Sequence, residues 1–328
     1  MTAELIEISQ TQPFANITWQ VSNICNYRCS YCNRANWDGS NLNLNIDKFF
    51  PGVDKLIEYQ LRQGNTKLKV FFSGGEPSLW KPLIPTMKHM YTKGFDEVKY
   101  AINTNLSVPL DWWITNHIYF DDIIASYHPE FSNDDGYIKK YIFLASKVNY
   151  VCARIMMDEN NWDKSITLSE KLKEECDKAG VNWIIEYAPI FDDLIGGATP
   201  YIYKNPKCTE FFKKTTIEKS IKYYVEEKVK NISNYEVYSD GSTRPLNSNN
   251  LVVERKNFFK GWKCMLPSEN IFISSSGNIV AGSCGVMEDI GNIYDPLLDI
   301  HLPDWIICPK HHCHCGTDIN ISKKKHFT

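Results

Sequence analysis

Three cysteines near the start of the chain are spaced in a way that suits iron–sulfur chemistry. Cys25, Cys29 and Cys32 follow a short apolar run at C-x3-C-x2-C spacing. Four cysteines would bind every iron of a four-iron cluster, whereas three thiolates leave one iron open. An open metal position can bind a substrate or a cofactor. The spacing therefore predicts a cluster that takes part in catalysis.

Two simpler interpretations of these cysteines are a zinc knot and a set of buried free thiols. Zinc usually needs two cysteine pairs, or one pair with histidines. No histidine lies near Cys32 in the sequence, which favours the iron–sulfur interpretation.

A second loop with chemical potential is Gly74-Gly75-Glu76, which follows the apolar run Lys67 to Phe72. Paired glycines let the backbone approach a ligand closely, and Glu76 could pair with an ammonium group. A lone Gly-Gly-Glu could also be only a strand-to-helix turn. Its place roughly 40 residues after the cysteines predicts that two strand-end loops face one pocket.

The elements that must position these loops alternate between strand and helix. Between residues 15 and 190 the strand–helix pattern repeats about six times. This alternation is typical of parallel strands joined by helical crossovers, so we predict an α/β fold. The strand-like runs are Ile17 to Val21, Lys67 to Phe72, Glu97 to Ile102, Ile123 to Ser126, Tyr150 to Met157 and Trp183 to Tyr187.

The alternation of strands and helices stops between residues 190 and 260. There we expect a connector, with helical spacing from Cys208 to Lys230 and a turn at Asp240-Gly241. A second cysteine group follows, around a hairpin signal at Ser276-Gly277. Its members are Cys264, Cys284, Cys308, Cys313 and Cys315.

Cysteines grouped at both ends of a chain without an export signal indicate metal binding. His311, His312 and His314 keep a zinc site open as an alternative for the second group. The other cysteines, Cys152, Cys176 and Cys208, are scattered, and each is expected to be an ordinary buried or surface thiol.

Length, net charge and hydropathy limit the classes of binding partner that we expect. The chain has 328 residues, which allows about two domains. A formal charge of -3 leaves no basic field for nucleic acid. Neither a signal peptide nor a membrane-spanning apolar stretch is apparent, so we expect a cytoplasmic protein with no membrane partner.

On these motifs the chain resembles the radical S-adenosylmethionine superfamily. The match covers the cysteine spacing with Tyr31, the Gly-Gly-Glu loop and the strand–helix order. The resemblance implies a partial (β/α)6 TIM-like barrel over residues 1–190. It also implies a 4Fe-4S cluster on Cys25, Cys29 and Cys32, whose open iron is chelated by S-adenosylmethionine. An external reductant of the flavodoxin or ferredoxin type would deliver one electron, giving a 5′-deoxyadenosyl radical that takes a hydrogen atom from the substrate.

The resemblance also suggests residues for the cofactor. Glu76, with the backbone of Gly74 and Gly75, would hold the methionine amine, and Tyr31 would lie near the adenine. Arg154 would face the methionine carboxylate; the alternative is a strand arginine in an ion pair. Further ribose and carboxylate contacts are expected at Asn103, Asn105 and Ser126.

The C-terminal cysteines resemble the SPASM/twitch-like auxiliary cluster domains of the superfamily. Five cysteines fit the shorter form, which holds one auxiliary 4Fe-4S cluster. We expect a connector at 191–260 and this small iron–sulfur domain at 261–328. The preferred ligands are Cys264, Cys284, Cys313 and Cys315, with Cys308 as the rival for one place.

Three further residues are expected to face the substrate. His128, at a strand end, could position the substrate or act as a base; the alternative is a structural turn before Pro129. Glu186 lies in an otherwise apolar strand and needs a partner, which marks it as a pocket residue. Cys152 could return a hydrogen atom to a substrate radical, although a buried core thiol is the better explanation.

The sequence thus predicts a radical S-adenosylmethionine enzyme, of oxidoreductase or epimerase type, acting on a small polar substrate such as a sugar or aminocyclitol. Cys25 lies too near the first residue for the N-terminal peptide-binding domain of many peptide-modifying relatives. A maturase for a ribosomally made peptide is the second hypothesis. The third is a non-catalytic electron-transfer or zinc-stabilised binding protein.

Overall fold

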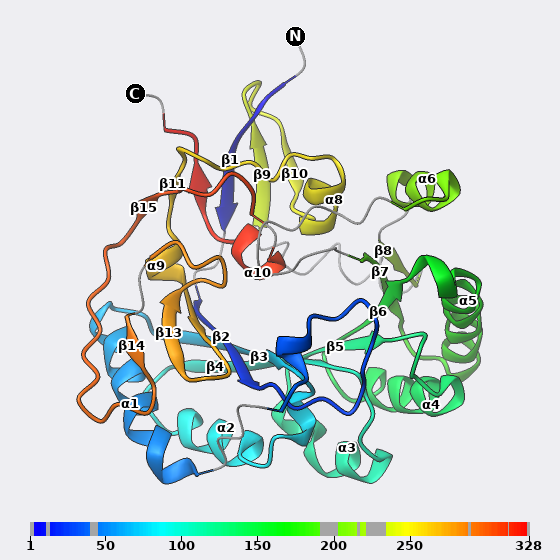
Figure 1. Cartoon of the computed structure of the whole chain (residues 1–328), viewed down its shortest axis with the longest axis horizontal. Helices are drawn as coiled ribbons and strands as arrows, with labels where there is room; N and C mark the ends of the chain where they lie inside the picture. Colours follow the sequence, from blue (N-terminus) through cyan, green and yellow to red (C-terminus); the bar gives the residue numbers. More distant parts are fainter. Residues whose placement is uncertain are drawn as a thin grey trace.

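A ten-stranded sheet forms the frame of the molecule (Figure 1). The computed structural model describes residues 3–10, 14–39, 45–190, 203–214, 217–220, 234–287, 290–313 and 315–326. Consecutive strands from β2 to β7 are parallel neighbours, which confirms the predicted α/β pattern. These strands are β2 (Ala15–Ser22), β3 (Lys67–Gly74), β4 (Glu97–Thr104), β5 (Asp122–Tyr127), β6 (Tyr150–Met157) and β7 (Ile184–Pro189).

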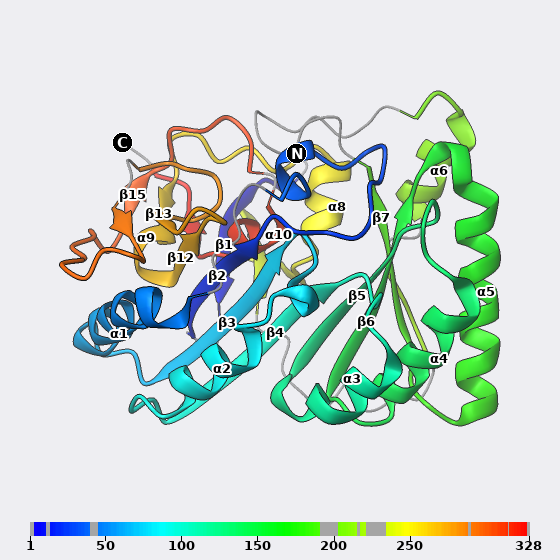
Figure 2. The ribbon, with the colours of Figure 1, turned by 60° about the horizontal axis from the view of Figure 1, so that its bottom comes forward.

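Helices connect the parallel strands and lie along the outer side of the sheet (Figure 2). In the first helix, Phe49, Val53 and Leu56 recur at helical spacing and are buried against the strands. Among the described helices, none is both long enough and apolar enough to cross a membrane. The helices are α1 (Ile46–Arg62), α2 (Leu83–Tyr91), α3 (Leu110–Asn116), α4 (Asp134–Ala145) and α5 (Trp162–Ala179), with 3-10 turns η1 (Arg34–Asn36), η2 (Pro77–Leu79), η3 (His117–Tyr119) and η4 (Glu159–Asn161).

The parallel arrangement brings the carboxyl ends of the strands to one edge of the sheet. The loops that begin at residues 23, 75, 105 and 128 therefore all start from the same side. These loops carry eight of the predicted site residues: Cys25, Cys29, Tyr31, Cys32, Gly75, Glu76, Asn105 and His128.

Both edges of the parallel region are extended by other strands. On one side β12 (Asn270–Ile273) pairs in parallel with β2, and the predicted hairpin joins it to β13 (Asn278–Ala281) and then β14 (Gly291–Asn292). On the other side β8 (Ile217–Lys219) pairs antiparallel with β7.

The helix predicted from Cys208 to Lys230 is wrong at Ile217–Lys219, which form a strand. The structure has α6 (Pro206–Lys214) and then β8, whose backbone groups satisfy the open edge of β7. The unpaired edge is a tertiary feature, so helical spacing in the sequence could not reveal it. Residues 221–230 lie outside the described part of the chain.

A second sheet of six strands joins distant parts of the chain, and Figure 1 shows it above the main sheet. Its strands, in order, are β10 (Thr243–Pro245), β9 (Asn234–Tyr238), β1 (Leu5–Gln10), β16 (Lys323–Lys324), β11 (Lys263–Cys264) and β15 (Ile306–Ile307). The β9–β10 pair confirms the predicted connector hairpin. Strand pairs cross both predicted domain boundaries, and the three-part division stays a prediction. The short helices here are α8 (Ser248–Val253), α9 (Leu266–Glu269) and α10 (Gly316–Ile319).

Candidate active site

The three N-terminal cysteines lie in one loop that leaves the end of β2. Cys29 is buried, and Cys25 and Cys32 are half-buried. A turn closes around them, with the Cys32 amide donating to the Cys29 carbonyl at 3.0 Å. Burial raises the pKa of all three thiols, that of Cys29 to about 12. Three soft sulfur donors on one short loop are a ligand set that fits an iron–sulfur cluster.

The Gly-Gly-Glu loop is in backbone contact with this cysteine loop. The Gly75 amide donates to the Ser22 carbonyl at 2.9 Å, and the Glu76 amide donates to the Ile24 carbonyl at 2.6 Å. A side chain on Gly75 would overlap the Ile24 carbonyl, and one on Gly74 would overlap that of Ser22. Gly74 also has a φ of +117°, which glycine adopts readily. The paired glycines therefore let the two loops touch, as a pocket shared by both loops requires.

Glu76 is almost fully buried, at 1% exposure, and its carboxylate joins two strand ends. Oε1 accepts hydrogen bonds from the Ser78 amide at 3.0 Å and the Thr104 hydroxyl at 2.7 Å. Oε2 accepts one from the Asn105 amide at 2.6 Å. Burial raises the pKa of Glu76, and these donors partly offset the effect. A carboxylate oxygen can accept a second hydrogen bond, and the predicted contact between Glu76 and the methionine amine stays a prediction.

The two predicted asparagine contacts lie in different surroundings. Asn105 reaches the cysteine loop, where its amide donates to Asn26 at 3.1 Å and approaches the Cys25 sulfur at 3.8 Å. Asn103 accepts a hydrogen bond from the Ser126 hydroxyl at 2.7 Å. Asn105 therefore supports the cysteine loop directly, while Asn103 and Ser126 form a polar pair on β4 and β5.

Charged residues continue this polar surface across β6 and β7. Ser126, Arg154 and Glu186 occupy paired positions on three adjacent strands. The Arg154 Nε atom donates to Glu186 Oε2 at 2.6 Å, so the partner that Glu186 needed is Arg154. Burial alone would lower the pKa of Arg154, but the Glu186 carboxylate raises it. Cys152 lies buried two residues before Arg154, and burial raises its thiol pKa to about 12.

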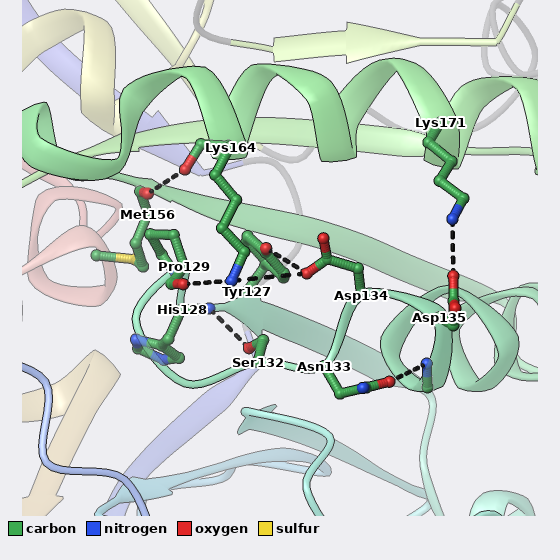
Figure 3. Close-up of polar contacts among 12 residues, drawn as sticks. Tyr127, His128, Pro129, Ser132, Asn133, Asp134, Asp135, Met156, Lys164 and Lys171 are labelled. Atoms are coloured by element: carbon green, nitrogen blue, oxygen red, sulfur yellow. Dashed lines mark hydrogen bonds and ion pairs between the residues drawn. The ribbon is translucent and has the colours of Figure 1, made fainter.

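His128 begins the loop after β5, and the structure brings its ring to the cysteine loop. Figure 3 shows the ring pointing away from α5, while Lys164 reaches from α5 to the loop backbone. The Lys164 ammonium donates to the Pro129 carbonyl at 2.6 Å. His128 Nδ1 lies 2.9 Å from the Tyr31 hydroxyl oxygen and 3.5 Å from the Cys29 sulfur. Burial lowers the pKa of His128 to about 4.

The C-terminal cysteines gather beside the six-stranded sheet. Cys264, Cys308 and Cys313 are buried, and Cys284 and Cys315 are half-buried. Burial raises the pKa of four of these thiols, and the negative charge of neighbouring cysteines or of Asp318 raises it further. The four thiols are the preferred ligands Cys264, Cys284, Cys313 and Cys315.

Two buried charged residues support this group. Asp318, at 1% exposure, accepts hydrogen bonds from the Ser283 hydroxyl at 2.8 Å and the Cys284 amide at 2.9 Å. Lys323, at 3% exposure, donates to backbone carbonyls, including that of Ile321 at 2.9 Å. The Lys323 charge counteracts part of the pKa rise at Cys264 and Cys313.

The zinc alternative receives no support from the described residues. Within the described ranges, no three histidine, cysteine or acidic side chains are arranged to hold a single metal ion. A cluster binds each thiolate to a different iron, so its ligands are further apart and this finding does not test it. His311 lies 3.0 Å from the Lys260 ammonium, and His312 packs on Phe258. His314 lies outside the described residues.

Comparison with known proteins gives matches only among solved structures: no protein-family model and no curated protein matches the chain. Native anSMEcpe with bound AdoMet (S-adenosylmethionine) is 15% identical, with a TM-score of 0.53, over 85% of this chain and 78% of that chain. Streptococcus suis SuiB bound to the precursor peptide SuiA is 14% identical, with a TM-score of 0.50, over 88% of this chain and 64% of SuiB. SuiB bound to AdoMet is 15% identical, with a TM-score of 0.50, over 87% of this chain and 64% of SuiB. The chain therefore shares the fold of these solved structures.

Further residues support the loops and thiols described above. Thr104 and Asn26 hold the strand-end loops together, Lys164 anchors the loop after β5, and Asp318 and Lys323 support the C-terminal thiols. None belongs to a recognisable motif. The sequence signal for Asp318 and Lys323 is their place shortly after the last two cysteines.

Proposed function

We propose that this chain is a radical S-adenosylmethionine enzyme. The backbone contact between the cysteine loop and the Gly74–Gly75–Glu76 loop carries the proposal. It supports a single pocket in which three thiols and a buried acid meet at the carboxyl ends of β2 and β3. The fold shared with AdoMet-bound structures supports the same function.

Cys25, Cys29 and Cys32 would hold a 4Fe-4S cluster, beside which AdoMet would bind. Together these groups supply a one-electron reductive cleavage, which yields methionine and a 5′-deoxyadenosyl radical. Glu76 and Arg154 orient the amino-acid part of AdoMet, because their opposite charges match its ammonium and carboxylate. Gly74 and Gly75 bring the backbone close enough to share this contact. The electron comes from an external reductant of the flavodoxin or ferredoxin type.

The substrate would be a small polar molecule, such as a sugar or aminocyclitol, that loses a hydrogen atom from an unactivated carbon. The neighbouring Ser126, Arg154 and Glu186 side chains support this class, since hydroxyl, cationic and anionic groups suit a ligand rich in hydroxyl and amino groups. His128 contacts the cysteine loop, and its predicted role toward the substrate stays a prediction.

Two outcomes follow hydrogen-atom abstraction. If the Cys152 thiol returns a hydrogen atom from the opposite face, the product is an epimer, and the Cys152 thiyl radical left behind would regain its thiol by taking one electron from the external reductant and one proton from solvent. If the substrate radical instead loses one electron and one proton, the product is oxidised, and the Glu186 carboxylate on this polar surface would accept the proton. An auxiliary cluster on Cys264, Cys284, Cys313 and Cys315 would supply the electron acceptor for the second outcome.

A peptide substrate is the second candidate, which one structural feature favours. Strands β10 and β15 lie at the two edges of the six-stranded sheet. Edge strands present unpaired main-chain groups that can bind an extended peptide by strand addition. SuiB, whose fold this chain shares, is bound to its precursor peptide in the matching structure.

The test is anaerobic reconstitution with iron and sulfide, followed by incubation with reductant and AdoMet. We expect slow release of 5′-deoxyadenosine even without substrate. Cys29→Ala should abolish it, whereas Cys176→Ala, a buried cysteine on α5, should not. Failure of the unaltered chain to release 5′-deoxyadenosine, with its cluster intact, would overturn the proposal.

A further inference from the structure

His128, Tyr31 and Cys29 form a closed polar contact at the edge of the proposed cluster site. His128 Nδ1 lies 2.9 Å from the Tyr31 hydroxyl oxygen and 3.5 Å from the Cys29 sulfur. Interaction with the Tyr31 side chain offsets part of the rise that burial causes in the pKa of the Cys29 thiol. The sulfur thus has two potential donors from different loops, one attached to the imidazole and one to the phenol.

The His128 ring is held in place by its own loop. Its amide donates to the Ser132 hydroxyl at 3.0 Å, and the Ser132 amide donates to the His128 carbonyl at 2.8 Å. The Lys164 ammonium holds the next carbonyl, that of Pro129 (Figure 3). The ring also stacks on Tyr31, with an interplanar angle of 13°. The position of Nδ1 is therefore set before any cofactor binds.

A second contact fastens the same two loops together. The Ser30 amide donates to Glu130 Oε2 at 2.9 Å, and the Ser30 hydroxyl donates to the other oxygen of that carboxylate. Contacts at Cys29, Ser30 and Tyr31 therefore join three successive residues of the cysteine loop to the loop after β5.

The direction of the hydrogen bonds follows from the state of the sulfur. A cysteine that binds iron is a thiolate, which accepts hydrogen bonds and has no proton to donate. An Nδ1 lone pair would repel that sulfur. The stable arrangement therefore has a proton on Nδ1 and directs the Tyr31 O–H at the Cys29 sulfur. Both the neutral tautomer protonated at Nδ1 and the imidazolium satisfy this requirement.

We propose that His128 and Tyr31 are positioning residues that donate hydrogen bonds to the cluster-binding sulfur of Cys29 and thereby raise the reduction potential of that cluster. The inference rests on the proposed function. Hydrogen bonds to cluster sulfurs stabilise the reduced, more negative state, and they are one of the factors that set the potential. Their effect is to ease the entry of the electron from the external reductant.

The test compares His128→Leu with His128→Asn. The asparagine amide offers an N–H close to the position of Nδ1, whereas leucine has a similar shape and no donor. Each variant is reconstituted, its iron is counted, and its redox titration is followed by electron paramagnetic resonance without AdoMet. The signal that changes when AdoMet is added identifies the N-terminal cluster.

We expect His128→Leu to make reduction about tenfold less favourable, equivalent to about 59 mV for one electron. His128→Asn should recover most of that loss, and Tyr31→Phe should also lower the potential. His301→Leu, at an exposed histidine that pairs with Asp299, is the control and should leave the potential unchanged.

Two results would overturn the inference: an unchanged potential in a fully loaded His128→Leu protein, or equal losses in the leucine and asparagine variants. If His128→Leu does not retain iron, Tyr31→Phe decides, and an unchanged or higher potential there rejects the inference. An unaltered chain that binds no cluster at Cys25, Cys29 and Cys32 would instead reject the proposed function.

Discussion

The Arg154 side chain lies beside the Glu186 carboxylate, with Nε 2.6 Å from Oε2, at directly paired positions of β6 and β7. The Glu186 side chain is 11% exposed and that of Arg154 33%. Each charge therefore depends on the other for compensation, since both are partly removed from water. The pair belongs to the polar surface that we assign to AdoMet and substrate.

Removal of either Arg154 or Glu186 should lower the free energy of unfolding more than removal of both. Arg154→Met or Glu186→Leu alone removes one charge of this ion pair and leaves the other partly buried, which should lower the free energy of unfolding by about 2 kcal/mol given the exposure of Arg154. The double variant should lose less than either single variant. Urea unfolding of the four proteins measures the coupling. Additive losses would show that the two charges do not compensate each other.

Gly75→Ala should separate the two loops of the proposed site. The added methyl group would overlap the Ile24 carbonyl, and backbone on both sides limits relaxation. We expect a loss of about 3 kcal/mol in unfolding free energy, together with poor iron retention. Gly64→Ala is the control, because nothing lies within 4 Å of its added carbon and only its positive φ is strained. Equal losses in the two variants would contradict close loop contact.

AdoMet affinity should fall on acidification through the titration of Glu76. Burial raises the pKa of this carboxyl above its ordinary value of 4.5. As the pH falls through that raised pKa, Glu76 is protonated and the amine of AdoMet loses its anionic partner. As the pH is lowered, the loss of AdoMet binding measured by calorimetry should therefore begin while the pH is still above 4.5. 5′-Methylthioadenosine has no amine and should bind without this dependence; a matching loss for both ligands would remove Glu76 from the role.

Asp318→Asn should disturb the C-terminal thiols and spare the N-terminal ones. The amide NH2 group would face the donors that now bind the carboxylate, including the Cys284 amide. Loss of these hydrogen bonds should cost about 1–3 kcal/mol. Reconstituted protein should fall from about eight irons to about four per chain, with 5′-deoxyadenosine release retained. Asp240→Asn, in an exposed turn, should keep the full iron content.

The sequence predicts those parts of the structure that depend on short-range patterns. Ser276-Gly277 turns the chain between β12 and β13, as expected. Pairing between β12 and β2 joins residues far apart in the sequence, so no local pattern predicts it. The contact between Ser30 and Glu130 is unpredictable for the same reason. The motifs locate the cysteines and Glu76, but the residues that hold them come from other strands.

The pairing of β1 with β16 has a consequence for the order of events during synthesis. At about 5–20 residues per second, Lys324 is made roughly 15 to 60 s after Cys32. The cysteine loop therefore leaves the ribosome long before the strand that completes the six-stranded sheet exists. During most of this interval β2 also lacks β12, so one edge of the strand that leads into the cysteine loop is unpaired.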